Sequence, residues 1–516
     1  MVYVILGSLV LLSSVVLFVS GGLKLSYWNY FFSSPTWGTG LIIDNCSMCI
    51  CLMLLLCFSL VLVYIPHYFG GGDSVVYLTP LITVFVGTMG GLVFTGDTLL
   101  TLILWEYLGV VSFFLILFYL SYLSLRASVV TLVSSRFGDV CLFVVFAAVA
   151  YLNPNPWVLC CCFIFIICTK SASFPFISWL LEAMRAPTPV SSLVHSSTLV
   201  AAGVWFSLRY GISAGWGESN VMFVLLMITV IITGVASFFF FDLKKIVALS
   251  TCNNINWCLI YLILGGFWLS LFQLICHGVS KCLLFMLVGD VMSGTGGSQA
   301  SNYAYSPSFY GGYGSFGLVC VILGLSGAPF IGVFFTKHFM LSTLVGVFNA
   351  TTGFCVFIGV LLSYLYSFRL CRMLISVRAS APLGVLYTCA SFSITYWWLF
   401  LNFFGGATED EHSSLSGVST QVIWGFQLLA CLVCWAAYSS VILTFCCSSL
   451  FGVDNLVEGV YASFLKWESV VRVCLFRWDS YCLNLHPSSL SWASIRAINP
   501  IIGLIVVSLG LMAVMY

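Results

Sequence analysis

Apolar runs of about 20 residues, the length that crosses a bilayer as a helix, recur along the whole chain between short polar stretches. Runs this long favour helices over strands, and a bilayer leaves helices as the way to satisfy their backbone groups. The pattern predicts an all-α polytopic membrane protein with roughly 14–16 transmembrane helices. The number is given as a range because the stretch 316–346 could form one helix or two. The candidate spans lie near residues 2–20, 44–66, 76–96, 98–121, 128–151, 157–180, 188–212, 220–241, 246–265, 267–292, 316–346, 352–375, 384–404, 421–449 and 498–516.

Two segments depart from this pattern. Residues 293–315 are rich in Gly, Ser and Tyr, which predicts a loop. In residues 454–486 the apolar positions recur about every 3.5 residues, which predicts a long amphipathic helix lying along the membrane plane. A connecting helix packed on a soluble partner has the same pattern and stays an alternative. The charges of this segment are Asp454, Glu458, Lys466, Glu468, Arg472, Arg477 and Asp479.

Composition narrows the class of protein further. Hydrophobic residues make up 61% of the 516 positions and charged residues 6%, whereas a soluble domain carries about 25% charged residues. A soluble globular protein is therefore excluded, and so is a disordered chain, which needs low hydrophobicity and high charge. The formal net charge of +1 gives no basic field for nucleic acid. Membrane lipid is the expected surrounding.

The 23 cysteines lie mostly inside apolar runs such as Cys160-Cys161-Cys162, where they act as small hydrophobic residues. Cys46, Cys49 and Cys51 form a C-x-x-C-x-C run that could bind a metal. No further Cys/His cluster in the sequence completes such a site, so the apolar interpretation is preferred.

The abundant residues point to a particular kind of genome. Phe (45), Gly (45), Cys (23) and Trp (16) have codons rich in T and G, while lysine, with A-rich codons, occurs seven times. This bias suggests mitochondrial encoding. The apolar N-terminus without a basic or Arg-rich leader fits insertion inside the organelle that makes the protein.

The candidate functional residues are the charged residues within or beside apolar spans. They are Glu106, Asp139, Lys170, Lys281 and Lys337. An intramembrane charge costs at least about 2.5–3.5 kcal/mol, so each is a functional candidate; a structural salt bridge or a snorkelling side chain is the alternative for any single one. An acid that approaches or leaves a buried lysine changes whether that lysine holds its proton. Several such groups together therefore favour a proton pathway.

Histidines and helix breaks extend this pathway. Histidine ordinarily titrates near ambient pH, so we expect His195 and His277 to relay protons. His277 shares a helix face with Lys281 because the two are four residues apart. Pro175 and Pro329 lie near Lys170 and Lys337, and broken helices mark transport sites in membrane proteins. A charged straight helix followed by a charged broken one, in each half, suggests two repeats; coincidence is the alternative.

The stretch from Lys170 to Arg209 carries a specific resemblance. It contains Lys-Ser-Ala-Ser-Phe-Pro, Ala-Pro-Thr-Pro-Val and His-Ser-Ser-Thr, and it resembles the signature of the chain 5 family of mitochondrial NADH:ubiquinone oxidoreductase (respiratory complex I). Further matches cover residues 76–375. They are Trp105-Glu106, Arg136-Phe-Gly-Asp139, the segment 242–251, His277-x-x-x-Lys281 and Pro329-Phe with Lys337.

The resemblance implies an antiporter-like, proton-translocating membrane subunit with two inverted repeats. The implied divisions are N-terminal helices (1–75), a first repeat (76–212), a second repeat (213–375), additional helices (376–449), a lateral helix (450–490) and a C-terminal anchor (491–516). Glu106 and Lys170 would be the switching pair, His195, His277 and Lys281 the central relay, Lys337 the way to the exit and Asp139 a further membrane acid.

The resemblance also implies where this chain works and with what. It would lie in the mitochondrial inner membrane beside other membrane subunits of the complex, especially the antiporter-like chains 4 and 2. NADH, FMN, iron–sulfur clusters and ubiquinone would belong to other subunits, so this chain would hold no cofactor and no redox centre of its own.

Three positions depart from the family pattern. Gln273 and Ser293 stand where the family usually has histidines, and His338 replaces an aspartate after Lys337. Two other interpretations remain open at this point: a cation/proton antiporter subunit, whose large chains share these motifs, and a scaffold in which the charges only hold helices together.

Overall fold

The computed structural model describes residues 40–151, 156–211, 216–293, 296–301, 305–307, 311–328, 333–347, 350–375, 378–380, 398–402, 417–436, 450 and 453–484. The predicted spans at 2–20 and 498–516, most of the span at 384–404, and Pro329 lie outside these residues. Two compact units divide the chain, residues 1–453 and 454–516.

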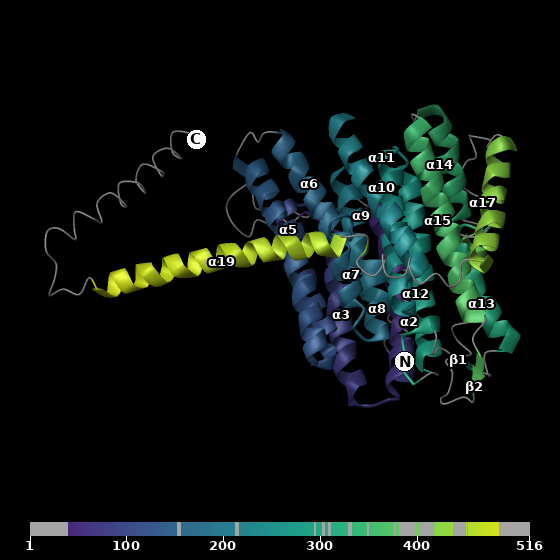
Figure 1. Cartoon of the computed structure of the whole chain (residues 1–516), viewed down its shortest axis with the longest axis horizontal. Coiled ribbons are helices and arrows are strands. Elements are labelled where there is room, and N and C mark those ends of the chain that lie inside the picture. Colours follow the sequence, from purple (N-terminus) through teal and green to yellow (C-terminus); the bar gives the residue numbers. More distant parts are fainter. Residues whose placement is uncertain are drawn as a thin grey trace. The chain divides into compact units, whose positions relative to one another are not determined.

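The first unit is a bundle of helices (Figure 1). Its elements up to the middle of the chain are α2 (Asn45–Phe69), α3 (Asp73–Val93), α4 (Thr98–Ile116), η1 (Leu117–Tyr119), α5 (Tyr122–Tyr151), α6 (Pro156–Lys170), α7 (Ser178–Ala183), α8 (Thr188–Leu193), η2 (Val194–Thr198) and α9 (Leu199–Tyr210). The later elements are α10 (Trp216–Phe239), α11 (Leu243–Ile263), α12 (Phe267–Ser293), β1 (Tyr305–Pro307), α13 (Gly311–Ser326), α14 (Phe334–Val347), α15 (Ala350–Ile375), β2 (Arg378–Ser380) and α17 (Gly417–Ala436).

Nine helices within the described residues are long and apolar enough to cross a membrane. An all-helical membrane fold is thereby confirmed, with one small exception: β1 and β2 pair as two parallel strands of three residues each. Each predicted span from 44–66 to 352–375 contains at least part of an observed helix. The stretch at 316–346 proves to be two helices, α13 and α14.

Three interruptions in the helices coincide with candidate site residues. Helix α6 stops at Lys170, and Ala172 takes a left-handed conformation (φ 55°) before α7 begins at Ser178. Helix α13 ends at Ser326, and α14 resumes at Phe334. Between α8 and α9, the turn that carries His195 is π-helical, a feature common at functional sites.

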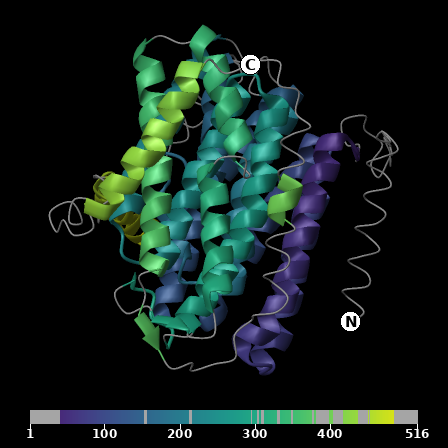
Figure 2. The ribbon, with the colours of Figure 1, turned by 90° about the vertical axis from the view of Figure 1, so that its right-hand side faces the viewer.

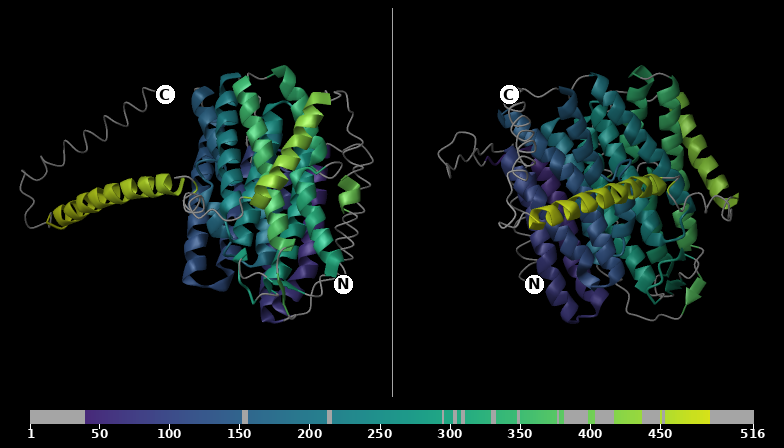
Figure 3. Two further views of the ribbon diagram at one scale, coloured as in Figure 1. Left: turned by 45° about the vertical axis from the view of Figure 1, so that its right-hand side comes forward. Right: turned by 60° about the vertical axis from the view of Figure 1, so that its left-hand side comes forward.

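The helices differ in how much of their surface the bundle covers. The span Thr188–Tyr210 is 100% buried and Leu243–Ile263 and Phe267–Ser293 are 89% buried, whereas Asp73–Val93 is 33% buried. Helices α8, α9, α11 and α12 therefore form the interior. Figures 2 and 3 show helices of the bundle running roughly alongside one another. Helix α5 packs against both α4 and α6, and α15 against α10 and α17.

The second unit contains α19 (Val453–Asn484), which begins at the last residue of the first unit. Its position agrees with the amphipathic helix predicted over 454–486. Side chains from 455 to 478 are exposed, and Arg472 forms an ion pair with Glu468 one turn earlier.

Candidate functional site

Two acids and an arginine form a charged cluster between α4 and α5. Arg136 forms an ion pair with Glu106, and its Nη1 also lies 3.5 Å from Oδ2 of Asp139, one turn along the same helix. Asp139 is 2% exposed, whereas Glu106 is 23% exposed and Arg136 38%. Arg136 thus touches both carboxylates from the more accessible side of the cluster.

Lys170, at the end of α6, approaches the cluster from the buried side. It is completely buried, and its Nζ lies 3.8 Å from Oδ1 of Asp139. The same Oδ1 accepts a hydrogen bond of 3.0 Å from Nε1 of Trp105, and the lysine ammonium lies 5.0 Å from the centre of the Trp105 ring. Asp139 is therefore the carboxylate that faces Lys170, while Glu106 is held by Arg136.

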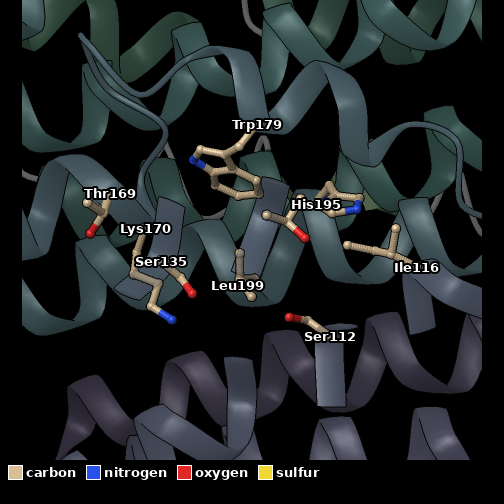
Figure 4. A pocket seen from close by; sticks show the side chains of 9 residues that line it. Ser112, Ile116, Ser135, Thr169, Lys170, Trp179, His195 and Leu199 are labelled. Carbon is tan, nitrogen blue, oxygen red and sulfur yellow. The ribbon is translucent and has the colours of Figure 1, made fainter. Parts of the chain in front are cut away.

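The ammonium of Lys170 has no hydrogen-bond acceptor within the described residues. It lines a small pocket with room for about one water molecule. The other lining residues are Ser112, Ile116, Thr131, Ser135, Thr169, Trp179, His195 and Leu199. In Figure 4, Trp179 and Leu199 lie between Lys170 and His195. A water here would give the ammonium an oxygen partner, as a proton relay requires.

His195 closes the far end of this pocket. It is completely buried in the π-helical turn, and neither ring nitrogen has a hydrogen-bond partner among the described residues. Its ring lies 6.2 Å from the Trp179 ring, centre to centre. A buried imidazole with two free nitrogens can accept a proton on one side and release it on the other.

His277 and Lys281 lie on α12, both fully or almost fully buried. The Lys281 ammonium donates hydrogen bonds to Oγ of Ser250 and, at 3.4 Å, to the carbonyl of Val247, both on α11. Neither ring nitrogen of His277 has a hydrogen-bond partner in the part of the chain that the structure describes. The pair predicted to share a helix face is thus buried in the bundle interior.

Lys337 lies in the first turn of α14, just after the second helix break. Its Nζ donates to the carbonyl of Ser326 and to Oγ of Ser363, both at 2.5 Å, and lies 4.6 Å from the centre of the Tyr364 ring. Gly327, in the left-handed region (φ 86°), passes so close that a Cβ there would lie 3.1 Å from the lysine Cδ. The break therefore supplies both an acceptor for the lysine and room for its side chain.

The three departures from the family pattern have different surroundings. Gln273 is buried, and its Oε1 accepts a 2.8 Å hydrogen bond from Thr336, so it ties α12 to α14 beside Lys337. Ser293 is exposed at the end of α12. The His338 ring packs against Phe334 with 4.0 Å between ring centres.

The structure brings Asp139 and Lys170 together and links Lys170 to His195 through the pocket. His277, Lys281 and Lys337 lie apart from that cluster on later helices. The sequence did not identify the side chains that contact the charged site residues, which are Arg136, Trp105, Ser250 and Ser363. Arg136 and Trp105 could have been found because they lie in the motifs shared with the family, whereas no sequence feature marks the two serines. The sequence also did not identify Lys244, which is 4% exposed and donates to the carbonyl of Ala186 at 3.2 Å.

The cysteine run on α2 does not gather other ligands. Cys46, Cys49 and Cys51 are half-buried free thiols. Within the described residues, no three His, Cys, Asp or Glu side chains come together as a metal ion would need.

Buried lysines at two broken helices, in a bundle whose interior is formed by α8, α9, α11 and α12, define a class of protein, an antiporter-like transmembrane subunit. The comparisons agree with it. The family described as NADH:quinone oxidoreductase/Mrp antiporter, transmembrane, matches residues 95–365, more than half of the chain. The chain belongs to this family.

Among its relatives are NADH-ubiquinone oxidoreductase chain 5 proteins of animals. The chain is 34% identical over 340 residues to that of Aedes aegypti, matching 61% of this chain and 57% of the relative. It is 32% identical over 394 residues to that of Mytilus edulis, matching 72% of this chain and 68% of the relative. The chain thus spans somewhat more than half the length of the first of these curated relatives. The predicted resemblance to the chain 5 family is confirmed.

A solved structure shares the fold. The Mrp complex from Dietzia sp. DQ12-45-1b contains a chain that matches with a TM-score of 0.73 at 19% identity, covering 95% of this chain and 60% of that one. At this identity the likeness concerns the fold alone, and it confirms the antiporter-like architecture.

Proposed function

We propose that this chain is a proton-translocating membrane subunit of an NADH:ubiquinone oxidoreductase. The observation that carries the proposal is Lys170: a completely buried lysine, 3.8 Å from a buried carboxylate, that lines a water-sized pocket leading to His195. Burying a charge in the membrane is costly, so buried charges are found paired with an opposite charge or at functional sites. Lys170 has a carboxylate beside it and lines a pocket. The chain 5 relatives supply the redox context.

Arg136 supplies the switch in this proposal. It is an always-charged group in contact with both Glu106 and Asp139. When Arg136 holds Glu106, Lys170 has Asp139 alone as its counter-charge. When Glu106 is released towards Lys170, the lysine gains a second negative charge and keeps its proton. Glu106 and Lys170 thus act as the switching pair, and Asp139 keeps the lysine in place between the two states.

The rest of the predicted relay completes the path. The proton passes from Lys170 through the pocket to His195, and on through His277 and Lys281 to Lys337, which leads to the exit. Gln273 can hydrogen-bond but not titrate, so its role is to hold Thr336 and the start of α14 in register with α12. Water molecules bridge the steps for which no side chain is in reach.

The architecture follows the same proposal. Two inverted repeats, 76–212 and 213–375, each contain one of the two broken helices with its lysine, α6–α7 with Lys170 and α13–α14 with Lys337. Residues 1–75 and 376–449 add helices outside the repeats. Helix α19, with residues 450–490, is the lateral helix lying along the membrane, and 491–516 anchors its far end. The exposed apolar and charged side chains of α19 support its assignment as the lateral helix.

The proposed setting is the mitochondrial inner membrane, with mitochondrial encoding. The partners are the other membrane subunits of the complex, especially the antiporter-like chains 4 and 2. NADH, FMN, iron–sulfur clusters and ubiquinone act in other subunits, and redox energy reaches this chain through conformational and electrostatic coupling.

A cation/proton antiporter subunit is the second candidate. The family description that includes Mrp antiporters and the fold shared with an Mrp complex favour it. Purification separates the two: a large complex that oxidises NADH supports the first function, and a complex that exchanges sodium for protons supports the second.

The decisive variant for proton translocation is Lys170→Ala. NADH-driven acidification in sealed membranes should fall by about a hundredfold, the contribution of a positioned proton-transfer group, while the complex still assembles. Lys245→Ala is the matched control, because Lys245 is 37% exposed and pairs with Asp242, the residue just before α11. Unchanged pumping in Lys170→Ala would refute the relay.

A further inference from the structure

A histidine–aspartate pair outside the predicted relay joins the ends of α2 and α12. Nε2 of His67 lies 3.3 Å from Oδ1 of Asp290. His67, in the last turn of α2, is 22% exposed, whereas Asp290 is 2% exposed. One member of the pair thus reaches the surface of the bundle, and the other is buried in it.

Two hydroxyls meet at Gly289, the residue before Asp290, because Gly289 has no side chain. A Cβ on Gly289 would lie 2.5 Å from Oη of Tyr64 and 3.3 Å from Oγ1 of Thr188. The Thr188 hydroxyl is buried and has no hydrogen-bond partner among the described residues. The glycine therefore leaves a narrow place where hydroxyls from α2 and α8 converge.

From this place a polar line runs inward along one helix face. Thr188, Ser192 and Ser196 are four residues apart from one another along the chain, and His195 is three residues after Ser192, which puts them on one side of α8 and the π-helical turn. All four are at most 2% exposed. The line ends at His195, which lines the Lys170 pocket.

Other charged or titratable groups around the pair are few. Helices α2, α8 and α12 pack on one another; their charged or histidine side chains, with Asp44 just before α2, are His67, Asp290, His277 and Lys281. Lys281 lies nine residues from Asp290, on the opposite face of α12. Lys244 on α11 holds the carbonyl of Ala186, two residues before Thr188.

We propose that His67 and Asp290 form a proton-collecting pair that connects one surface of the bundle to His195 through the Thr188–Ser192 face of α8. Protonated His67 gives its Nε2 proton to Oδ1 of Asp290, which leaves a neutral imidazole and a carboxylic acid. Asp290 then passes the proton to the hydroxyls and water beside Gly289 and becomes a carboxylate again. This inference rests on the proposed proton relay.

The test uses the assembled complex in sealed membranes, with His67→Ala, Asp290→Asn and Lys170→Ala compared under NADH. His67→Ala and Asp290→Asn should each lower the initial pumping rate about tenfold, since each removes one proton-transfer group from a path that water serves in part. Added imidazole should restore much of the His67→Ala rate relative to wild type in the same buffer, because a diffusible base replaces the missing ring. A purely structural histidine would not respond in this way.

Asp73→Asn is the matched control: Asp73 is an exposed acid that starts α3, six residues after His67. If Lys170→Ala abolishes pumping while His67→Ala and Asp290→Asn pump at the wild-type rate, or if imidazole restores nothing in His67→Ala, the collecting pair is refuted and the relay stands. If Lys170→Ala pumps normally, the proposed function itself fails. Should Asp290→Asn not assemble, His67→Ala with imidazole decides alone.

Discussion

The two halves of the bundle hold their buried lysines in different ways. In the first half, Lys170 lies against a carboxylate and a tryptophan ring and donates no hydrogen bond within the described residues. In the second half, Lys281 and Lys337 donate to hydroxyl and carbonyl oxygens, and no carboxylate of the described residues lies within 4 Å of either.

This difference matters because the two environments respond differently to a moving charge. A carboxylate stabilises an ammonium through a full charge, which depends strongly on the separation. Hydroxyl and carbonyl dipoles can bond a lysine nitrogen that is charged or neutral, since both forms donate. The first half is thus suited to be switched by moving charges, and the second to receive and hand on a proton within fixed hydrogen bonds.

The largest expected effect tests whether the second half carries protons at all. Lys281→Met and Lys337→Met remove the titratable nitrogen at similar volume, and each should slow NADH-driven pumping by about a hundredfold. Pumping is measured as initial acidification of sealed membranes, with Lys245→Met as the exposed control. If both variants pump like wild type, the second half is only structural and the comparison between the halves loses its meaning.

The next effect comes from making the first half resemble the second. Asp139→Asn keeps the shape and an acceptor for Trp105, but removes the charge that faces Lys170. Pumping should fall about tenfold, which corresponds to a loss of about 1.4 kcal/mol of charge stabilisation. Asp97→Asn is the control, because Asp97 lies just before α4 and its carboxylate accepts a hydrogen bond from the Gly40 amide rather than facing Lys170. An Asp139→Asn complex with full activity would show that the carboxylate is not the partner that matters.

Close packing between α5 and α6 gives a smaller effect. At Gly138 a Cβ would lie 2.1 Å from Oγ1 of Thr169, the residue before Lys170. Gly138→Ala should cost about 1–3 kcal/mol of stability through overpacking and displace Lys170 as well, so thermal stability and pumping should fall together. Gly359→Ala, where a Cβ would lie 2.9 Å from the Trp257 ring, should lower stability with a weaker effect on pumping. Equal losses of pumping in the two variants would contradict the special position of Lys170.

The smallest effect concerns one hydrogen bond in the second half. Ser363→Ala removes one of the two acceptors of Lys337 and leaves the carbonyl of Ser326. Pumping should slow about threefold, as expected from about 0.5–1 kcal/mol for one hydrogen bond. Ser367→Ala, one turn later, is the control because its hydroxyl donates to the carbonyl of Tyr364 instead. A tenfold loss would mean that Lys337 depends on its partners as strongly as Lys170 does.

The spans that lie within the described residues, and the burial of most candidate site residues, could be predicted from the sequence because both leave a local pattern. An apolar run long enough to cross a bilayer, and an isolated lysine inside it, can both be recognised in the amino-acid sequence, as at Lys170 and Lys281. The serine partners could not be predicted, since Ser250 and Ser363 are two among many serines in apolar helices and only the packing of α11 on α12 and of α14 near α15 selects them. The pairing of His67 with Asp290 could not be predicted either, because the two residues are 223 positions apart in the sequence and only the packing of α2 on α12 brings them together.

By itself, then, the sequence determined the class of fold, the family and several of the buried charges, which are Asp139, Lys170, Lys281 and Lys337. It could do so because hydrophobicity, helix length and motif spacing are properties of neighbouring residues. Only the tertiary structure decided which charges meet. Glu106, Asp139 and Lys170 come from three helices, and the sequence contains no measure of their separation. The lateral packing of α4, α5 and α6 brings Lys170 close to Asp139 and pairs Glu106 with Arg136. An ion pair depends on distances between helices, and the periodicity along one helix cannot determine those distances.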